Sequence, residues 1–386
     1  MTIKTALATA QGLEGGRTGA LAAQQASSAL GAARPAFGLV FAAREFALGE
    51  VLAGMEQVLG SIPLWAVATR CPLMNDTETP RSVTVALAAG SEIKVRPFWL
   101  PDYAGAGKTA AQELSQAMMT EAQVVQAALL AMDGFQGNPL LLAPAFEGLP
   151  ITAAGCLVDG DLQAGRTVQG VGARSCGAGG LAGLLFGGSV RMGAGWGHGW
   201  KDTGVHLKIT RIRERWITSL EDNTPADVYS RWLGREPREW SYPPLNELVR
   251  LYPLGSLGEK PWLRAPLHVE VDGSFRLNVP ITEGGNACLM VGDPTACLEA
   301  LRTAARSARQ QLGDARPFLA IALVDAGWRM LLELQPQILP HVLAEELGDV
   351  PLVGGATLGQ MIRLPNTPYE VQNQQALVIL LGESVR

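Results

Sequence analysis

Apolar runs of strand length alternate along this chain with longer stretches that have helical composition. The pattern is clearest near the two ends. An Ala- and Gln-rich stretch at 18–30 precedes an apolar run at 37–41, and a similar stretch at 294–312 precedes an apolar run at 318–324. Both ends therefore predict a helix followed by a buried strand.

The two ends also share sequence. LGAARP at 30–35 returns as LGDARP at 312–317, and IPLWAVAT at 62–69 returns as VPLVGGAT at 350–357, after a second helix-like segment in each case. This internal repeat predicts helix, strand, helix, strand twice over. The expected fold class is α/β, with two related lobes of mixed sheets flanked by helices.

The middle of the chain gives weaker patterns. A helix is predicted over 109–132, and the turn at 147–150 is expected to join two strands with no helix between them. Strands are predicted at 83–88, 92–99, 139–146, 151–157, 205–217, 288–291 and 376–381, with a hairpin turn at 272–274.

A helix start follows at Thr224 and Pro225, because an N-cap hydroxyl and a first-turn proline both stabilise helix N-termini. That helix is expected to end at Gly234, and the Pro-rich segment 237–253 after it resembles a connection. We therefore expect one domain over 1–235 and a second over 236–386.

Bulk composition narrows the classes of protein. The 386 residues are 47% hydrophobic and 17% charged, which is typical of soluble globular proteins, and no apolar run approaches the ~20 residues of a membrane span. The N-terminus has no continuous apolar segment of a secretory signal. The five cysteines are scattered, which favours a reducing cytoplasm. The net charge of -5 makes nucleic acid an improbable partner.

Two glycine-rich motifs resemble nucleotide-binding loops. The segment 104–109, with Lys108, resembles a phosphate-binding loop, but Asp102 stands where that motif requires a glycine and would repel phosphate. The segment 177–182 matches a dinucleotide fingerprint loosely, without a clear preceding strand, so close backbone packing is the better interpretation. No motif of a hydrolase triad is present in the sequence.

His198 lies between two tryptophans in a glycine-rich stretch, GWGHGW, at 195–200. A histidine with aromatic neighbours could line a ligand pocket or provide an axial haem ligand. Packing of a loop histidine explains the pattern as well, and we expect a protein without haem or another cofactor.

Together, the order of the elements and several short motifs resemble the FIST domain family, bacterial intracellular signal-transduction modules with N-terminal and C-terminal halves. The resemblance covers most of the chain. It rests on the segments 37–41, 62–64, 221–226, 252–255, 279–284 and 347–355.

Three motifs depart from the family's usual residues, at four positions. Ala326 replaces the cysteine of a Cys-x-x-Arg motif that keeps Arg329, and Gln360 replaces a glutamate. Gln372 and Gln375 replace the histidine and threonine of a His-Asn-x-Thr motif. These changes put in doubt any ligand preference that those side chains carry in relatives.

The resemblance implies a cytoplasmic sensory module that binds a small polar ligand, such as an amino acid, and reports to a separate signalling protein such as a histidine kinase or a cyclic-nucleotide enzyme. A haem-binding gas sensor, or an enzyme acting on a small molecule between the lobes, is the alternative. Arg329 would grip a carboxylate with its planar fork, although the glycines of the site fit tight strand packing equally well. The expected site is Asp325, Arg329, Gly354, Gly355, Thr357, Gln360 and Asn373.

Overall fold

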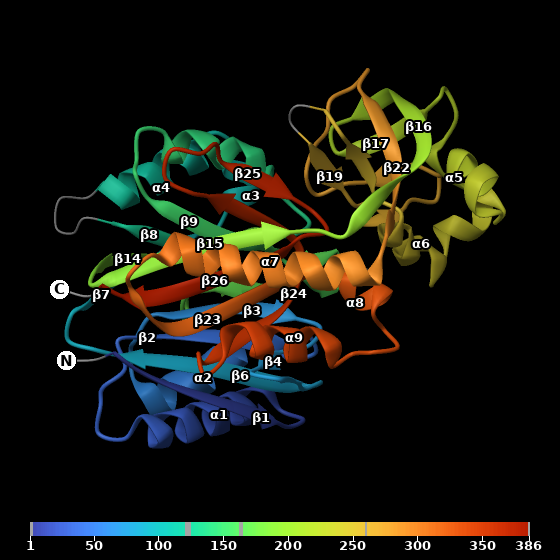
Figure 1. Cartoon of the computed structure of the whole chain (residues 1–386). Helices are drawn as coiled ribbons and strands as arrows, with labels where there is room; N and C mark the ends of the chain where they lie inside the picture. Colours follow the sequence, from blue (N-terminus) through green and yellow to red (C-terminus); the bar gives the residue numbers. More distant parts are fainter. Residues whose placement is uncertain (1–2, 120–124, 162–164, 259–260, 385–386) are drawn as a thin grey trace.

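The computed structural model describes residues 3–119, 125–161, 165–258 and 261–384. Its mixed sheets are flanked by helices, as the sequence predicts. Most of the chain is arranged in three units that share one strand order, and a smaller β-rich domain projects from one end of them (Figure 1). Among the described residues, no helix is long and apolar enough to cross a membrane.

The first unit has the strand order β1-β6-β2-β3, with β2 and β3 parallel and the other pairs antiparallel. Helix α1 connects β1 to β2, and α2 connects β2 to β3. The elements are β1 (Lys4–Gln11), α1 (Gly15–Leu30), β2 (Phe37–Ala43), α2 (Leu48–Leu59), β3 (Leu64–Thr69) and β6 (Ser82–Ala89).

The last unit repeats this plan in the order β15-β26-β23-β24, again with only the final pair parallel. The predicted helix-strand-helix-strand duplication is therefore confirmed, with the first copy in a six-stranded sheet and the second in an 11-stranded sheet. The elements are β15 (Val190–Gly197), α7 (Pro294–Leu312), β23 (Arg316–Asp325), α8 (Ala326–Leu331), α9 (Ile338–Leu347), β24 (Leu352–Arg363), β25 (Glu370–Gln372) and β26 (Ala376–Glu383).

A third copy of the plan, absent from our prediction, occupies the middle of the chain in the order β7-β14-β8-β9. Its third strand follows Leu149-Pro150-Ile151, which matches the Ile62-Pro63-Leu64 and Val350-Pro351-Leu352 that precede or open the equivalent strands. The elements are β7 (Ile93–Leu100), α3 (Tyr103–Ala106), α4 (Thr109–Met119), β8 (Ala127–Met132), η1 (Pro139–Phe146), β9 (Thr152–Val158) and β14 (Leu181–Gly188).

Three predictions for this middle unit were wrong. Of the predicted helix 109–132, Thr109–Met119 forms α4 and residues 120–124 lie outside the described part of the chain, but Ala127–Met132 forms the buried strand β8. An apolar run of six residues is compatible with a buried helix or a buried strand, and the pairing in the sheet selects the strand. The predicted strand 139–146 is the 3-10 helix η1, and the Asn138 side chain caps its N-terminus by accepting from the amide of Leu140. This helix lies where we expected none.

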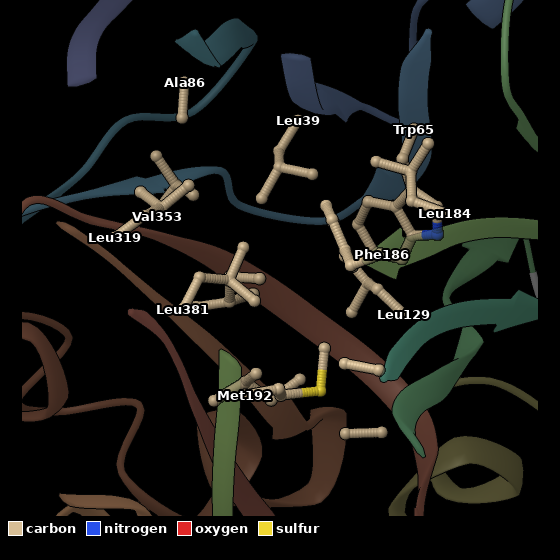
Figure 2. Packing of buried hydrophobic residues seen from close by; sticks show 14 of the residues in the cluster. Leu39, Trp65, Ala86, Leu129, Leu184, Phe186, Met192, Leu319, Val353 and Leu381 are labelled. Atoms are coloured by element: carbon tan, nitrogen blue, oxygen red, sulfur yellow. The ribbon is translucent and has the colours of Figure 1, made fainter. Parts of the chain in front are cut away.

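The three units turn one face of their sheets toward a shared core and the other toward their helices. Figure 2 shows Leu39 and Trp65 of the first unit, Phe186 of the middle unit and Leu319 and Leu381 of the last unit converging on this core. Phe37 and Phe186 pack edge to face at 5.2 Å across two units. Burial on both faces explains why the strands are apolar runs without alternation.

Strands of different units also contact one another directly. Strand β24 pairs with β9, which joins the last and middle units, and Thr69 Oγ1 at the end of β3 donates to the carbonyl of Ala356 in β24. Short hairpins lie between the third and fourth strands of the first and middle units, and one of them forms a separate two-stranded sheet. They are β4 (Leu73–Met74), β5 (Thr77–Glu78), β10 (Gly160–Asp161), β11 (Arg166–Thr167), β12 (Gln169–Gly170) and β13 (Cys176–Gly177).

The small domain is residues 200–292, inserted between β15 and α7 of the last unit. The predicted boundary at residue 235 lies inside it, just after α5, and Thr224 caps α5 as predicted by accepting from the amide of Asp227. The elements are β16 (Trp200–Arg213), β17 (Trp216–Leu220), α5 (Pro225–Leu233), η2 (Pro237–Ser241), α6 (Leu245–Leu248), η3 (Val249–Leu251), β18 (Leu254–Ser256), β19 (Trp262–Arg264), β20 (His268–Val269), β21 (Phe275–Arg276) and β22 (Asn286–Gly292).

Candidate functional site

Buried polar side chains gather where β23 and β24 approach the small domain, and they form the strand-end cluster: Arg250, Asp325, Thr357, Gln360, Asn373 and Gln374. Asp325, at the end of β23, is fully buried. Its carboxylate accepts from the Nη2 of Arg250 at 2.7 Å, and from the amides of Gly327 and Gln374 at 3.0 Å each. Arg250, supplied by η3 of the small domain, thus occupies the position beside Asp325 that a ligand cation would need.

The amides of Gln360 and Asn373 are paired in the same way, whereas Oε1 of Gln374 and Nε of Arg250 are buried with no hydrogen-bond partner among the described residues. Gln360 donates to the hydroxyl of Thr357 at 2.6 Å and accepts the backbone amide of Gln375 at 3.2 Å. Asn373 donates to the carbonyl of Leu358 at 2.7 Å and accepts from the amide of Ala265 at 3.3 Å. Protein atoms therefore already use the hydrogen-bonding groups of these predicted site residues.

Arg329 lies outside the cluster. It forms an ion pair with Glu78 of β5, and its side chain is half-buried. Gly354 and Gly355 lie in β24, where an added side chain would overlap the carbonyl of Ala322 and the side chain of Thr69, respectively. At these two positions the backbone of β24 passes very close to its neighbours.

A cavity of about 280 Å³ opens beside the cluster, where the last unit meets the small domain. We call it the junction cavity. Its walls come from the end of β15, the β18–β19 hairpin, β22 and the segment around β25, and its lining includes Trp196, His198, Trp262, Glu370, Gln372 and Gln375.

Gln375 provides one polar group of this cavity that is not hydrogen-bonded to other described residues. The residue is only 5% exposed, and its side-chain amide forms no hydrogen bond to the described residues. The amide lies at the cavity wall, where a ligand or water can form the hydrogen bonds that protein atoms do not supply. Gln372 differs, because it accepts from Leu263 and Arg264 and donates to Pro261, which fastens the β18–β19 hairpin to β25.

His198 stands at the exposed rim of the junction cavity. Its Nδ1 accepts the backbone amide of Trp200 at 3.2 Å, so the neutral ring carries its proton on Nε2. Partial burial lowers the pKa of His198, which favours this neutral form. At neutral pH, His198 can therefore donate a hydrogen bond from Nε2.

Charges of both signs lie at or near the cavity. Glu370 is an exposed carboxylate in the lining. Arg264 lies behind Gln372, is buried, and has no carboxylate within ion-pair distance among the described residues; burial lowers its pKa from 12.5 to about 10. Its guanidinium stacks on Trp262 at 5.9 Å. This arrangement suits a ligand that carries both a cationic and an anionic group.

Haem does not fit this cavity as it stands. A histidine that ligates a metal normally donates from its other ring nitrogen, whereas Nδ1 of His198 accepts a hydrogen bond. The volume of about 280 Å³ also lies at the lower end of the range for small-molecule sites, about 300–1,000 Å³, and is too small for a porphyrin.

The two glycine-rich motifs do not have the geometry of nucleotide-binding loops. Asp102 caps α3 by accepting from the amide of Gly105 at 3.1 Å, which places a carboxylate where a phosphate would bind. The segment 177–182 runs from β13 into the strand β14 and does not open a helix, and a side chain at Gly180 would overlap Trp99.

Comparison with known proteins places the chain in a family. The FIST N domain model matches residues 36–223, and the FIST C domain model matches residues 225–363. FIST domains are associated with sensory roles in signal transduction. No curated protein matches the chain.

Two solved structures align with low scores. A cyanuric acid hydrolase from A. caulinodans aligns over 100% of both chains with a TM-score of 0.38 and 9% identity. PurLQS from Thermotoga maritima aligns over 99% of this chain and 72% of that chain, with a TM-score of 0.26 and 12% identity. The two family models together cover most of the chain, which therefore belongs to the FIST family.

Proposed function

We propose that the protein is a sensory module that binds a small polar metabolite, such as an amino acid, in the junction cavity. The observation that carries this proposal is the side-chain amide of Gln375, which lines the cavity and has no hydrogen-bond partner among the described residues. The FIST family's association with sensing provides the context.

An amino acid matches the cavity in size and charge. Its ammonium group can lie near Glu370 and against the faces of Trp196 and Trp262, where cations are attracted to aromatic rings. Its carboxylate can accept from His198 and Gln375 on the side where Arg264 contributes positive potential. Glutamine at positions 372 and 375, in place of the family's histidine and threonine, would then alter the preferred ligand.

The small domain supplies one wall of the cavity, so ligand binding would bias its position relative to the last unit. A separate signalling protein, such as a histidine kinase or a cyclic-nucleotide enzyme, would read that change. In this proposal the protein acts in the cytoplasm.

A thermal-shift screen against the amino acids and related metabolites tests the proposal. At 100 times its dissociation constant, a ligand should stabilise the protein by about 2.7 kcal/mol, which raises Tm by a few degrees. Gln375→Leu should weaken binding about ten-fold or more, because the ligand's polar group then faces a methyl group.

Gln310→Leu, an exposed change on α7, serves as the matched control and should leave the affinity unchanged. Mass spectrometry of the incubated ligand separates a sensor from an enzyme, since a sensor returns it unaltered. Equal affinity in wild type and Gln375→Leu, measured by calorimetry, would contradict the proposed site.

A further inference from the structure

We propose that Asp202, His206 and Cys288 form a binding site for a divalent transition-metal ion of the zinc type. The three side chains lie in the small domain, on β16 and β22, and one ligand atom from each lies within 4.8 Å of the other two. No step of the proposed sensing function uses them, so the two ideas stand independently.

The β-ladder brings the three residues together. His206 and Cys288 are directly opposite each other in the antiparallel β16–β22 pair, so their side chains share one face of the sheet. Asp202 lies four residues before His206, a separation of about 13 Å along a regular strand. A register shift between Asp202 and His206 shortens this path.

The irregularity at this point is supported by specific contacts. Gly204 has a φ of 80°, which a side chain would disfavour, and the Thr203 hydroxyl donates to the carbonyl of Leu289 at 2.8 Å. The amide of Gly204 donates to Oδ1 of Asp202 at 2.9 Å, while Oδ2 lies 4.0 Å from Nε2 of His206. The bulge therefore orients the carboxylate toward the imidazole, as outer contacts orient the ligands of metal sites.

The donor set selects the metal. A thiolate, an imidazole and a carboxylate are the ligands that Zn²⁺ takes in proteins, whereas Ca²⁺ and Mg²⁺ prefer oxygen ligands. Three protein ligands leave a fourth tetrahedral position for water or another small ligand. Cys288 is 5% exposed and His206 is exposed, so the site has a buried floor and an open entry.

Metal binding here must release a proton. Burial, together with the charge of Asp202, raises the pKa of the Cys288 thiol in the metal-free protein. A bound cation stabilises the thiolate, and the thiol proton passes to solvent as the metal–sulfur bond forms.

Titration of the reduced, tag-free full chain with Co²⁺ tests the proposal, because cobalt bound by thiolate absorbs in the near ultraviolet. We expect one Co²⁺ per chain, displaced by Zn²⁺, with this absorption lost in Cys288→Ser. Cys176→Ser, at a half-buried cysteine in the first unit's sheet, should keep it. Since the ring of His206 is exposed, His206→Ala should fold normally and weaken Co²⁺ binding at least ten-fold.

Several outcomes would overturn the site. They are the absence of a stoichiometric cobalt band in the wild type, a band that survives in Cys288→Ser, and a band lost in Cys176→Ser. If Cys288→Ser does not fold, the His206→Ala titration decides alone: unchanged Co²⁺ affinity in that variant excludes the site.

Discussion

The strand-end cluster and the junction cavity are neighbours that satisfy their polar groups in different ways. In the cluster, Asp325 pairs with Arg250, and Gln360 pairs with Thr357, all of them buried. In the cavity, the side-chain amide of Gln375 lines the wall and has no hydrogen-bond partner among the described residues. An unmade hydrogen bond alone therefore does not mark a binding site, because Nε of Arg250 and Oε1 of Gln374 in the cluster are also unpaired but are buried; the amide of Gln375 differs in lining a cavity.

Breaking the ion pair of the cluster should have the largest effect. Asp325→Asn leaves the charge of Arg250 buried without a counter-ion, and we expect a loss of about 3–5 kcal/mol in the free energy of unfolding. Urea denaturation measures it. Asp102→Asn, at the exposed cap of α3, is the matched control and should change stability by less than about 0.5 kcal/mol, because asparagine caps helices as well. A loss as small as the control's would show that the cluster is solvated and able to admit a ligand.

The next largest loss of stability is expected where β24 passes close to its neighbouring strand. Gly354→Ala places a methyl group against the carbonyl of Ala322, so the strands must separate, and we expect a loss of about 1–3 kcal/mol. Gly177→Ala, which has open space around it, should be nearly neutral in the same denaturation experiment. A stable Gly354→Ala protein that loses ligand binding would instead indicate that the glycine admits a ligand.

A substitution of Arg329 tests whether the ligand binds at this residue or in the junction cavity. Since Arg329 pairs with Glu78, Arg329→Lys should lower stability by about 1 kcal/mol or less and change the affinity of a cavity ligand by less than about two-fold. Calorimetry on both proteins measures the affinity. A ten-fold loss of affinity with an unchanged Tm would place the ligand's carboxylate on Arg329, as the family resemblance implies.

The smallest effect concerns the pH dependence of the cavity. The pKa of His198 is lowered by burial in the folded protein, so the unfolded chain binds its proton first, and stability is lost as the pH falls below the ordinary value of about 6.5. His198→Asn should flatten this part of the pH–stability curve slightly, as measured by urea denaturation at several pH values. His268, whose pKa burial also lowers, supplies a comparison through His268→Asn. An unaltered curve in His198→Asn would mean that solvent screens the ring fully.

Residue spacing and residue type alone were enough to predict the elements that depend on short-range interactions. The repeated helix-strand pattern at the two ends and the cap of α5 at Thr224 are read directly from residue spacing and type, and the structure has them. The hydrophobic pattern did not specify the elements of the middle unit correctly. There Ala127–Met132 is apolar on every side, so its period cannot distinguish a buried strand from a helix, and the third copy kept only its Leu-Pro-Ile motif.

Only the tertiary structure decided which polar residues have partners. The sequence places Asp325 at a strand end, but nothing local shows that Arg250, 75 residues earlier, fills the space beside it. Likewise, His198 and Gln375 lie far apart in the chain and line one cavity because β15 and β26 are adjacent strands. Hydrogen-bond partners far apart in sequence are set by the packing of whole units, so local patterns cannot reveal which groups remain free.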